Sequence, residues 1–236
     1  MKNKKLCDYL WIIASIVICL AIWLLKDMED THLIGYHILP VRILVPGFAL
    51  LTALYNFFAP GKRTWLITLA LLFAAIAETI NAMNLSFGLL FFAVTHTLLT
   101  IYHWRAAGPS NKIKINSGLV FAALYVVVVW AILANLHNPP LEYILVVPIY
   151  MIPLSIMAWR SVCTFGAKQS GRIILGSTLF YICDVLILAE LTAPNFSNPP
   201  FPLLFLSWAA YLPALFLLST IGKTTFDTPK HKSEWF

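Results

Sequence analysis

Apolar runs of roughly 20 residues recur along the whole chain, and a helix needs about that length to cross the hydrocarbon core of a membrane. Short segments that are polar or contain Pro and Gly separate the runs, among them "APGKR", "AAGPSNK", "NLHNPP" and "APNFSNPP". The pattern predicts eight spans, at about 9–25, 36–58, 64–82, 87–104, 116–135, 141–160, 171–191 and 201–222. They occupy nearly the whole chain, so we expect one all-α, polytopic membrane domain over residues 1–236 and no soluble module.

The composition argues against a soluble protein. Hydrophobic residues make up 60% of the chain and charged residues 11%, against roughly 25% charged residues in an ordinary soluble domain. The four cysteines, Cys7, Cys19, Cys163 and Cys183, form no CxxC pair, which argues against a disulfide framework or a cysteine zinc site. A net charge of +6 in such a chain indicates basic residues retained on the cytoplasmic face of a membrane rather than nucleic-acid binding.

The distribution of charge predicts how the spans are oriented. If the N-terminus is cytoplasmic, all of the 16 Lys and Arg residues except Lys26 and Arg42 fall on cytoplasmic segments or span ends. The first outer loop carries Asp27, Glu29 and Asp30. We therefore expect both termini in the cytoplasm. The basic start followed by an apolar run also fits a signal peptide, but the run is long and has no small-residue cleavage site, so a retained helix is expected.

Three formally charged residues, Arg42, Glu78 and Asp184, fall well inside predicted spans. A charge at the bilayer centre costs about 2.5–3.5 kcal/mol on insertion scales, and such residues usually face the bundle interior and mark a site. Counted at about 1.5 Å per residue from the outer span ends, all three lie roughly 6–10 Å deep. We therefore expect them to meet in one polar layer in the outer half of the membrane.

Other polar residues at mid-span are candidates to complete this site. His96 is expected a little deeper, roughly 14 Å from the outer end, and Asn81 lies on nearly the same helix face as Glu78. Tyr150 and Tyr211 are also mid-span. The structural alternative stays open for each of them, because a charged cluster can simply hold helices together and mid-span His and Tyr commonly form interhelical hydrogen bonds.

No catalytic signature of the HExxH, Walker, GxSxG or CxxC type occurs in the sequence. The remaining histidines have no metal-like spacing and are expected in loops or at span ends: His32, His37, His103, His137 and His231. No metal and no cofactor is therefore predicted, although His96 with two acids from other helices can in principle bind an ion. The tryptophans near span ends, Trp11, Trp65, Trp104 and Trp159, are typical of interfacial anchors.

Two segments share a pattern that suggests an internal repeat. "LLFAAIAETINAMN" and "STLFYICDVLILAE" each contain Leu-Phe followed, after four or three residues, by a carboxylate. The segments lie four spans apart, and both are expected to run outward. The pattern suggests two four-helix halves in parallel orientation, each of which contributes one acid to a shared site.

Four segments resemble a known family. "LFAAIAETINAMN…FFAVTHTLL", "YMIPLSIMAW", "GSTLFYICDVLILA" and "SWAAYLPALFLLSTIG" are similar to the YhhN lysoplasmalogenase family, whose members have eight helices. The resemblance covers about the second to the eighth span. It implies that the two acids of that family correspond to Glu78 and Asp184, its histidine to His96, and its tyrosines to Tyr150 and Tyr211. A lysine of the family's second helix corresponds to Arg42.

The sequence departs from the family pattern at several of these positions. Ala77-Glu78 stands where the family usually has Gly-Asp, Cys183 stands where it has Ser before the second acid, and Leu215 stands where a glutamine is usual. Because Glu78 is one methylene longer than Asp, the site is expected to be reshaped. The departures make the particular substrate, and to a lesser extent the activity, an open question at this stage.

The resemblance implies an ether hydrolase that cleaves the vinyl-ether bond of lysoplasmalogens to a fatty aldehyde and a glycerophospho-alcohol. Two carboxylates suit this chemistry, since one can donate a proton while the other stabilises an oxocarbenium-like cation. We expect Glu78 and Asp184 to be catalytic, and Arg42, Asn81, His96, Tyr150 and Tyr211 to bind substrate or water. The expected partners are a lysophospholipid and the bilayer of a bacterial inner membrane, without nucleic acid.

Two other functions fit the same features. Parallel halves with a buried acid pair also suit a small-solute or proton-coupled transporter. The departures at positions 77, 78 and 215 also suit a catalytically silent lipid-binding membrane protein.

Overall fold

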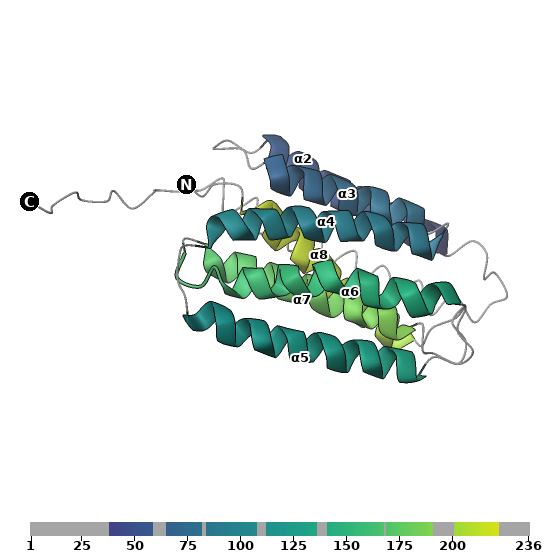
Figure 1. Cartoon of the computed structure of the whole chain (residues 1–236). Coiled ribbons are helices and arrows are strands. Elements are labelled where there is room, and N and C mark those ends of the chain that lie inside the picture. The colour runs from purple at the N-terminus through teal and green to yellow at the C-terminus, as the bar shows by residue number, and fades with distance from the viewer. Residues whose placement is uncertain are drawn as a thin grey trace, which may run out of the picture.

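In the computed structural model of the protein, seven α-helices account for nearly all of the residues that the structure describes, namely 38–58, 65–81, 84–107, 112–135, 141–167, 169–190 and 201–221 (Figure 1). The helices are α2 (Ile38–Phe58), α3 (Trp65–Asn81), α4 (Leu85–Ala106), α5 (Lys112–Asn135), α6 (Leu141–Val162), α7 (Ser170–Glu190) and α8 (Phe201–Ser219). The first predicted span, residues 9–25, lies outside the described residues. An eighth span and the cytoplasmic location of both termini therefore stay predictions.

The seven described helices begin and end within a few residues of the predicted spans, and local chemistry explains the differences. Helix α4 begins at Leu85 because the Asn84 side chain caps it, accepting a hydrogen bond of 3.2 Å from the backbone N–H of Phe87. Helix α6 extends to Val162, and the chain then reverses through a short turn before α7. Gly166 and Gln169 adopt positive φ angles of 85° and 67° there, the left-handed conformation that such a reversal requires.

Six of the helices form a closed ring, and α5 lies outside it. Around the ring, α2 packs against α3, α3 against α4, α4 against α6, α6 against α7, α7 against α8, and α8 returns to α2 (Figure 1). Helix α5 contacts mainly α6, and only 11% of the residues in its apolar stretch, within Asn116–Asn135, are buried. The interior of the ring is therefore the place where side chains from helices far apart in the sequence can meet.

The outer surface of the bundle is apolar, as expected of a chain that lipid surrounds. Four described helices are long and apolar enough to cross a membrane, over Ser86–Ala106, Asn116–Asn135, Tyr143–Val162 and Ser170–Ala189. Shorter apolar helices cover Val45–Phe58, Trp65–Asn81 and Leu206–Ser219. Large hydrophobic side chains such as Leu119, Trp130 and Ile149 are exposed. These features support a membrane protein.

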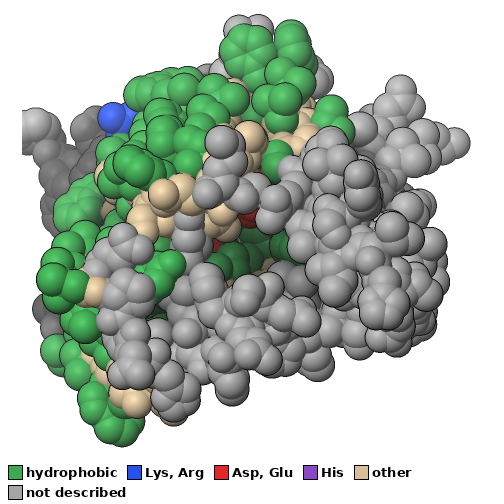
Figure 2. Space-filling model, turned by 90° about the vertical axis from the view of Figure 1, so that its right-hand side faces the viewer, with side chains coloured by type: hydrophobic (Ala, Val, Ile, Leu, Met, Phe, Trp, Pro, Cys, Tyr) green, Lys and Arg blue, Asp and Glu red, His purple; other side chains and the backbone are tan. Residues whose placement is uncertain are grey.

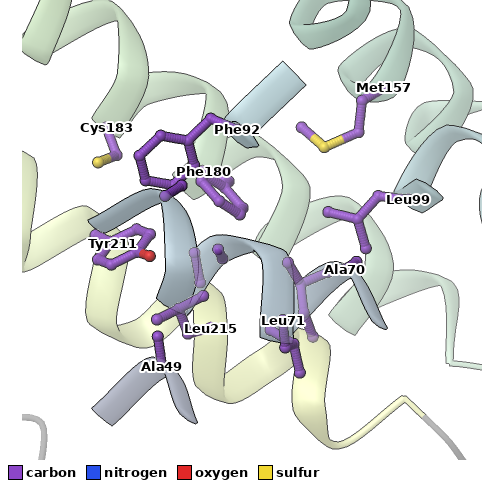
Figure 3. Packing of buried hydrophobic residues seen from close by; sticks show 14 of the residues in the cluster. Ala49, Ala70, Leu71, Phe92, Leu99, Met157, Phe180, Cys183, Tyr211 and Leu215 are labelled. Atoms are coloured by element: carbon purple, nitrogen blue, oxygen red, sulfur yellow. The ribbon is translucent and has the colours of Figure 1, made fainter. Parts of the chain in front are cut away.

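Small residues and aromatic rings fill the interior. A Cβ added to Gly88 on α4 would lie 2.7 Å from the Asn81 Cα atom, so only glycine permits the close approach of α3 and α4 at this point. Deeper in the ring, the side chains of Phe92, Phe180 and Tyr211 pack together, as Figure 3 shows. This aromatic cluster borders the polar side chains described next.

Candidate active site

Three buried polar side chains from α4, α6 and α7 meet at one carboxylate oxygen. The Tyr150 hydroxyl on α6 donates a hydrogen bond of 2.6 Å to Oδ2 of Asp184 on α7. His96 Nε2 on α4 lies 2.7 Å from the same Oδ2 atom and 3.0 Å from the Tyr150 hydroxyl oxygen. The geometry fits a His96 tautomer with hydrogen on Nε2, which donates to Asp184. All three side chains are at most 3% exposed, so each depends on the others for its hydrogen bonds.

Aromatic rings hold this triad in place. The imidazole of His96 stacks on Phe92, with ring centroids 6.4 Å apart, and meets Phe180 edge-on at 5.0 Å. Phe92 lies one helical turn before His96 on α4, and Phe180 lies one turn before Asp184 on α7. The two helices therefore bring both the polar groups and their apolar wall to the same level of the bundle.

Glu78 on α3 is the second acid of the site. Its carboxyl group lies beside the Tyr211 hydroxyl of α8 and interacts electrostatically with Asp184. The Tyr211 ring also packs against Phe92 and Phe180, at centroid distances of 6.3 Å and 5.4 Å. The two acids thus lie in one cluster inside the ring, on helices that do not contact each other extensively.

The two acids differ in exposure. Asp184 is 2% exposed, whereas Glu78 is partly exposed. Figure 2 looks onto the end of the bundle where α3 and α7 finish, and it shows a hollow with apolar and acidic atoms visible in its depth. Glu78 and Asp184 are the acids whose side chains the structure describes. Glu78 is therefore the more accessible of the two acids, and Asp184 is enclosed by its neighbours.

The structure brings together five of the seven predicted site residues: Glu78, His96, Tyr150, Asp184 and Tyr211. His96 was expected a little deeper than Asp184, and their side chains are in direct contact.

For the other two predicted residues, Asn81 and Arg42, the structure records no contact with this cluster among the described side chains. Asn81 ends α3, and among the described residues its buried Oδ1 atom has no hydrogen-bond partner. Arg42 lies in α2, but its side chain lies outside the part of the structure that is described, so its meeting with the acids stays a prediction.

Three of the residues that depart from the family pattern, Ala77, Cys183 and Leu215, are buried. Ala77 and Leu215 are fully buried in the core, and Cys183 is 1% exposed beside Asp184. Leu215 packs in the apolar part of the interior, near Ala49 and Leu71 (Figure 3). An apolar side chain at position 215 therefore fills space where a glutamine would need hydrogen-bond partners.

Sequence reasoning missed two sets of residues. The aromatic wall of Phe92 and Phe180 was not predicted. His103 lies in the last turn of α4, as expected of a residue at a span end, but its full burial was not predicted, and its Nε2 atom lies 3.4 Å from the Ser177 hydroxyl of α7. Spacing is the signal that could have found it. His103 lies seven residues after His96, and Ser177 seven before Asp184, so each pair shares a helix face.

No metal site is evident in the described part of the chain, since no group of three or more His, Cys, Asp and Glu side chains there could hold an ion. The polar cluster is instead arranged for proton transfer and hydrogen bonding. It offers a partly exposed carboxyl group, a buried carboxylate that accepts two hydrogen bonds, and an imidazole.

Comparison with known proteins gives one match. The model of the YhhN family matches residues 14–220, which is most of the chain. No curated protein shows a significant match. No solved structure shows a significant match either.

Proposed function

Because the chain belongs to the YhhN family, we propose that it is a lysoplasmalogenase-like hydrolase that cleaves a vinyl-ether bond of a lysophospholipid inside the membrane. The observation that carries the proposal is the meeting of Glu78 and Asp184 with His96, Tyr150 and Tyr211 inside the ring of helices. Acid–base catalysis needs positioned proton donors and acceptors within hydrogen-bond reach of the reacting atoms.

The geometry supports different roles for the two acids. Asp184 accepts hydrogen bonds from Tyr150 and His96, and such bonds stabilise the ionised form of a carboxyl group. We assign Asp184 as the carboxylate and Glu78, the more exposed of the two acids, as the proton donor. Environment separates the roles of two neighbouring carboxyl groups in the same way in other acid–base enzymes.

A balanced reaction follows from these roles. Glu78 transfers its proton to the vinyl carbon farther from the ether oxygen, and the neighbouring carbon becomes an oxocarbenium ion that the Asp184 carboxylate stabilises. Water adds to this carbon and gives one proton to Asp184, which forms a hemiacetal. In the collapse of the hemiacetal, Asp184 returns that proton to the leaving alkoxy oxygen and Glu78 removes the hydroxyl proton. The products are an aldehyde and an alcohol, and both acids regain their starting states.

The surroundings suit a substrate with a single alkenyl chain. The described atoms in the depth of the hollow are mostly apolar, so we propose that the alkenyl chain lies there while the head group remains near the open end (Figure 2). In this proposal Arg42 on α2 meets the phosphate of the head group. His96 and Tyr150 position the attacking water, and Asn81 binds a polar part of the substrate near the end of α3.

The experiment is to incubate the purified protein in detergent with a lysoplasmalogen and to measure released aldehyde by mass spectrometry. Wild-type protein should form aldehyde, whereas Glu78→Gln and Asp184→Asn should each reduce turnover at least about 100-fold, because general acid–base steps contribute about 10²–10⁴-fold. Glu190→Gln, at the last residue of α7, is the charge-matched control and should keep its activity. Full activity of the Glu78→Gln, Asp184→Asn double variant would refute the assignment.

The same experiment separates the proposal from its alternatives. Solute uptake into proteoliposomes without cleavage of any lysoplasmalogen would identify a transporter. Lipid that stays bound through purification, with no aldehyde formed, would identify a lipid-binding protein.

A further inference from the structure

A buried arginine lies at the opposite end of the bundle from the acids. Arg160 is in the last turn of α6, ten residues after Tyr150, so it lies about 15 Å farther along the helix axis. It is only 5% exposed. Its guanidinium group stacks over the Trp104 ring at 4.1 Å and lies 5.5 Å from the centroid of the Trp159 ring. The aromatic faces attract the cation but do not neutralise it.

The charge of Arg160 has no carboxylate partner among the residues whose side chains are described. The two acids in that set, Glu78 and Asp184, belong to the cluster near the other end. Within the same set, the buried Nε atom of Arg160 has no hydrogen-bond partner. A buried charge without a partner is strongly destabilising, so a bound anion is the arrangement that physical chemistry favours.

Other polar groups surround the same place. His103 of α4 interacts electrostatically with Arg160, and its Nε2 atom lies 3.4 Å from the Ser177 hydroxyl. Trp104, the side chain that covers the guanidinium, is 61% exposed at the end of α4. The guanidinium therefore lies one side chain below the surface, where α4 and α6 end. In a membrane protein these helix ends lie close to the phosphate groups of the lipids.

We propose that Arg160, with Trp104 beside it, binds a phosphate group, and that an anionic phospholipid head group at this end of the bundle supplies it. A guanidinium group presents donors in a fork that matches two phosphate oxygens, and the exposed Trp104 ring can lie against the lipid chains. Basic pockets between membrane helices bind such head groups, and here Arg160 is the basic group. This site is separate from the acid cluster and does not depend on the proposed hydrolysis.

The test uses the full chain, purified in a neutral detergent without phosphate. Its melting temperature and its retained lipid, by native mass spectrometry, are measured with phosphatidylglycerol, with inorganic phosphate, and with a diacylglycerol that has the same chains but no phosphate. Phosphatidylglycerol should raise the melting temperature and remain bound, whereas the diacylglycerol should do neither. A saturating ligand is expected to raise the melting temperature by roughly 5 °C.

Variants connect this effect to the guanidinium group. Arg160→Gln should bind phosphatidylglycerol at least about tenfold more weakly, as the loss of charge-assisted hydrogen bonds implies. Arg105→Gln, which removes an exposed arginine one residue after Trp104, should bind as the wild type does. If Arg160→Gln does not fold, Arg160→Lys takes its place, because lysine keeps the charge but loses the two-pronged hydrogen bonding and should bind more weakly.

Each outcome decides the proposal. A rise in melting temperature with phosphatidylglycerol alone supports a lipid head group as the source of the phosphate. A rise of equal size with inorganic phosphate supports a phosphate site that a free anion occupies. The proposal is overturned if neither probe stabilises the wild type, which would point to a carboxylate from the rest of the chain. The proposal is also overturned if phosphatidylglycerol stabilises the Arg160 variants as much as the wild type.

Discussion

The hydroxyl group of Tyr150 offers a sharp test of the acid cluster, because Tyr150→Phe removes one oxygen atom and leaves the ring in place. The hydroxyl donates to Asp184 Oδ2 at 2.6 Å, within the range of about 2.5–2.7 Å typical of a hydrogen bond between a hydroxyl and a carboxylate. Hydrogen bonds to charged groups contribute about 1.5–3 kcal/mol. If Asp184 uses this bond in the transition state, turnover should fall between about 10-fold and about 150-fold.

Stability should change far less than activity in this variant. Hydrogen bonds between membrane helices contribute about 0.6 kcal/mol on average and about 1.7 kcal/mol at most. His96 Nε2 remains 2.7 Å from the same carboxylate oxygen, so Asp184 keeps one partner. The melting temperature in detergent should therefore fall by only a few degrees, while aldehyde release, measured by mass spectrometry, falls steeply.

Tyr125→Phe is the matched control for this experiment. The Tyr125 hydroxyl also donates to α6, at 3.3 Å from the Pro148 carbonyl oxygen, and among the described residues it has no hydrogen bond to either acid. Its loss should leave turnover unchanged. In an Asp184→Asn background, Tyr150→Phe should add little further loss, because residues that act as a unit are not additive. Equal turnover in the Tyr150→Phe and Tyr125→Phe variants would refute the reasoning.

Three further predictions follow from the geometry. Gly88→Ala should lower the melting temperature markedly, since its Cβ would lie 2.7 Å from the Asn81 backbone. Gly47→Ala has nothing within 4 Å of the added Cβ and should leave the melting temperature unchanged or raise it. Equal melting temperatures of the two variants would contradict this packing. Glu78→Asp should retain measurable aldehyde release while Glu78→Gln loses it, and two equally inactive variants would contradict a proton-donor role. His96→Ala should reduce turnover about 10-fold or more with the protein still folded, and unchanged turnover would remove His96 from the site.

The helices could be predicted from the sequence because the segments between them are exposed to water and therefore contain polar and turn-forming residues. Charged residues, Pro and Asn mark the breaks, and the described helices begin and end near them. The closed ring could not be predicted in the same way. In a membrane, the side of a helix that faces lipid is as apolar as the side that faces its neighbours, so the apolar pattern does not say which neighbours a helix has or that α5 lies outside the ring.

The acids of the site could be found from the cost of placing charge in a membrane, which singled out Glu78 and Asp184. Their detailed partners could not. A residue count along each helix placed His96 deeper than Asp184, but helix packing and side-chain reach bring the two into contact. Arg160 and His103 were missed as a pair because each lies near a helix end, where a charged or polar residue is ordinarily solvated. Burial by neighbouring tryptophans is a tertiary effect that the linear pattern does not contain.

The most direct test of the central claim is turnover of a lysoplasmalogen by the wild-type protein in D₂O, with the aldehyde product examined by mass spectrometry. Proton transfer from Glu78 to carbon predicts an aldehyde that carries one deuterium on the carbon next to its carbonyl group, and no such product from the Glu78→Gln, Asp184→Asn double variant. An aldehyde without that deuterium, or no aldehyde from the wild type at all, would contradict the account.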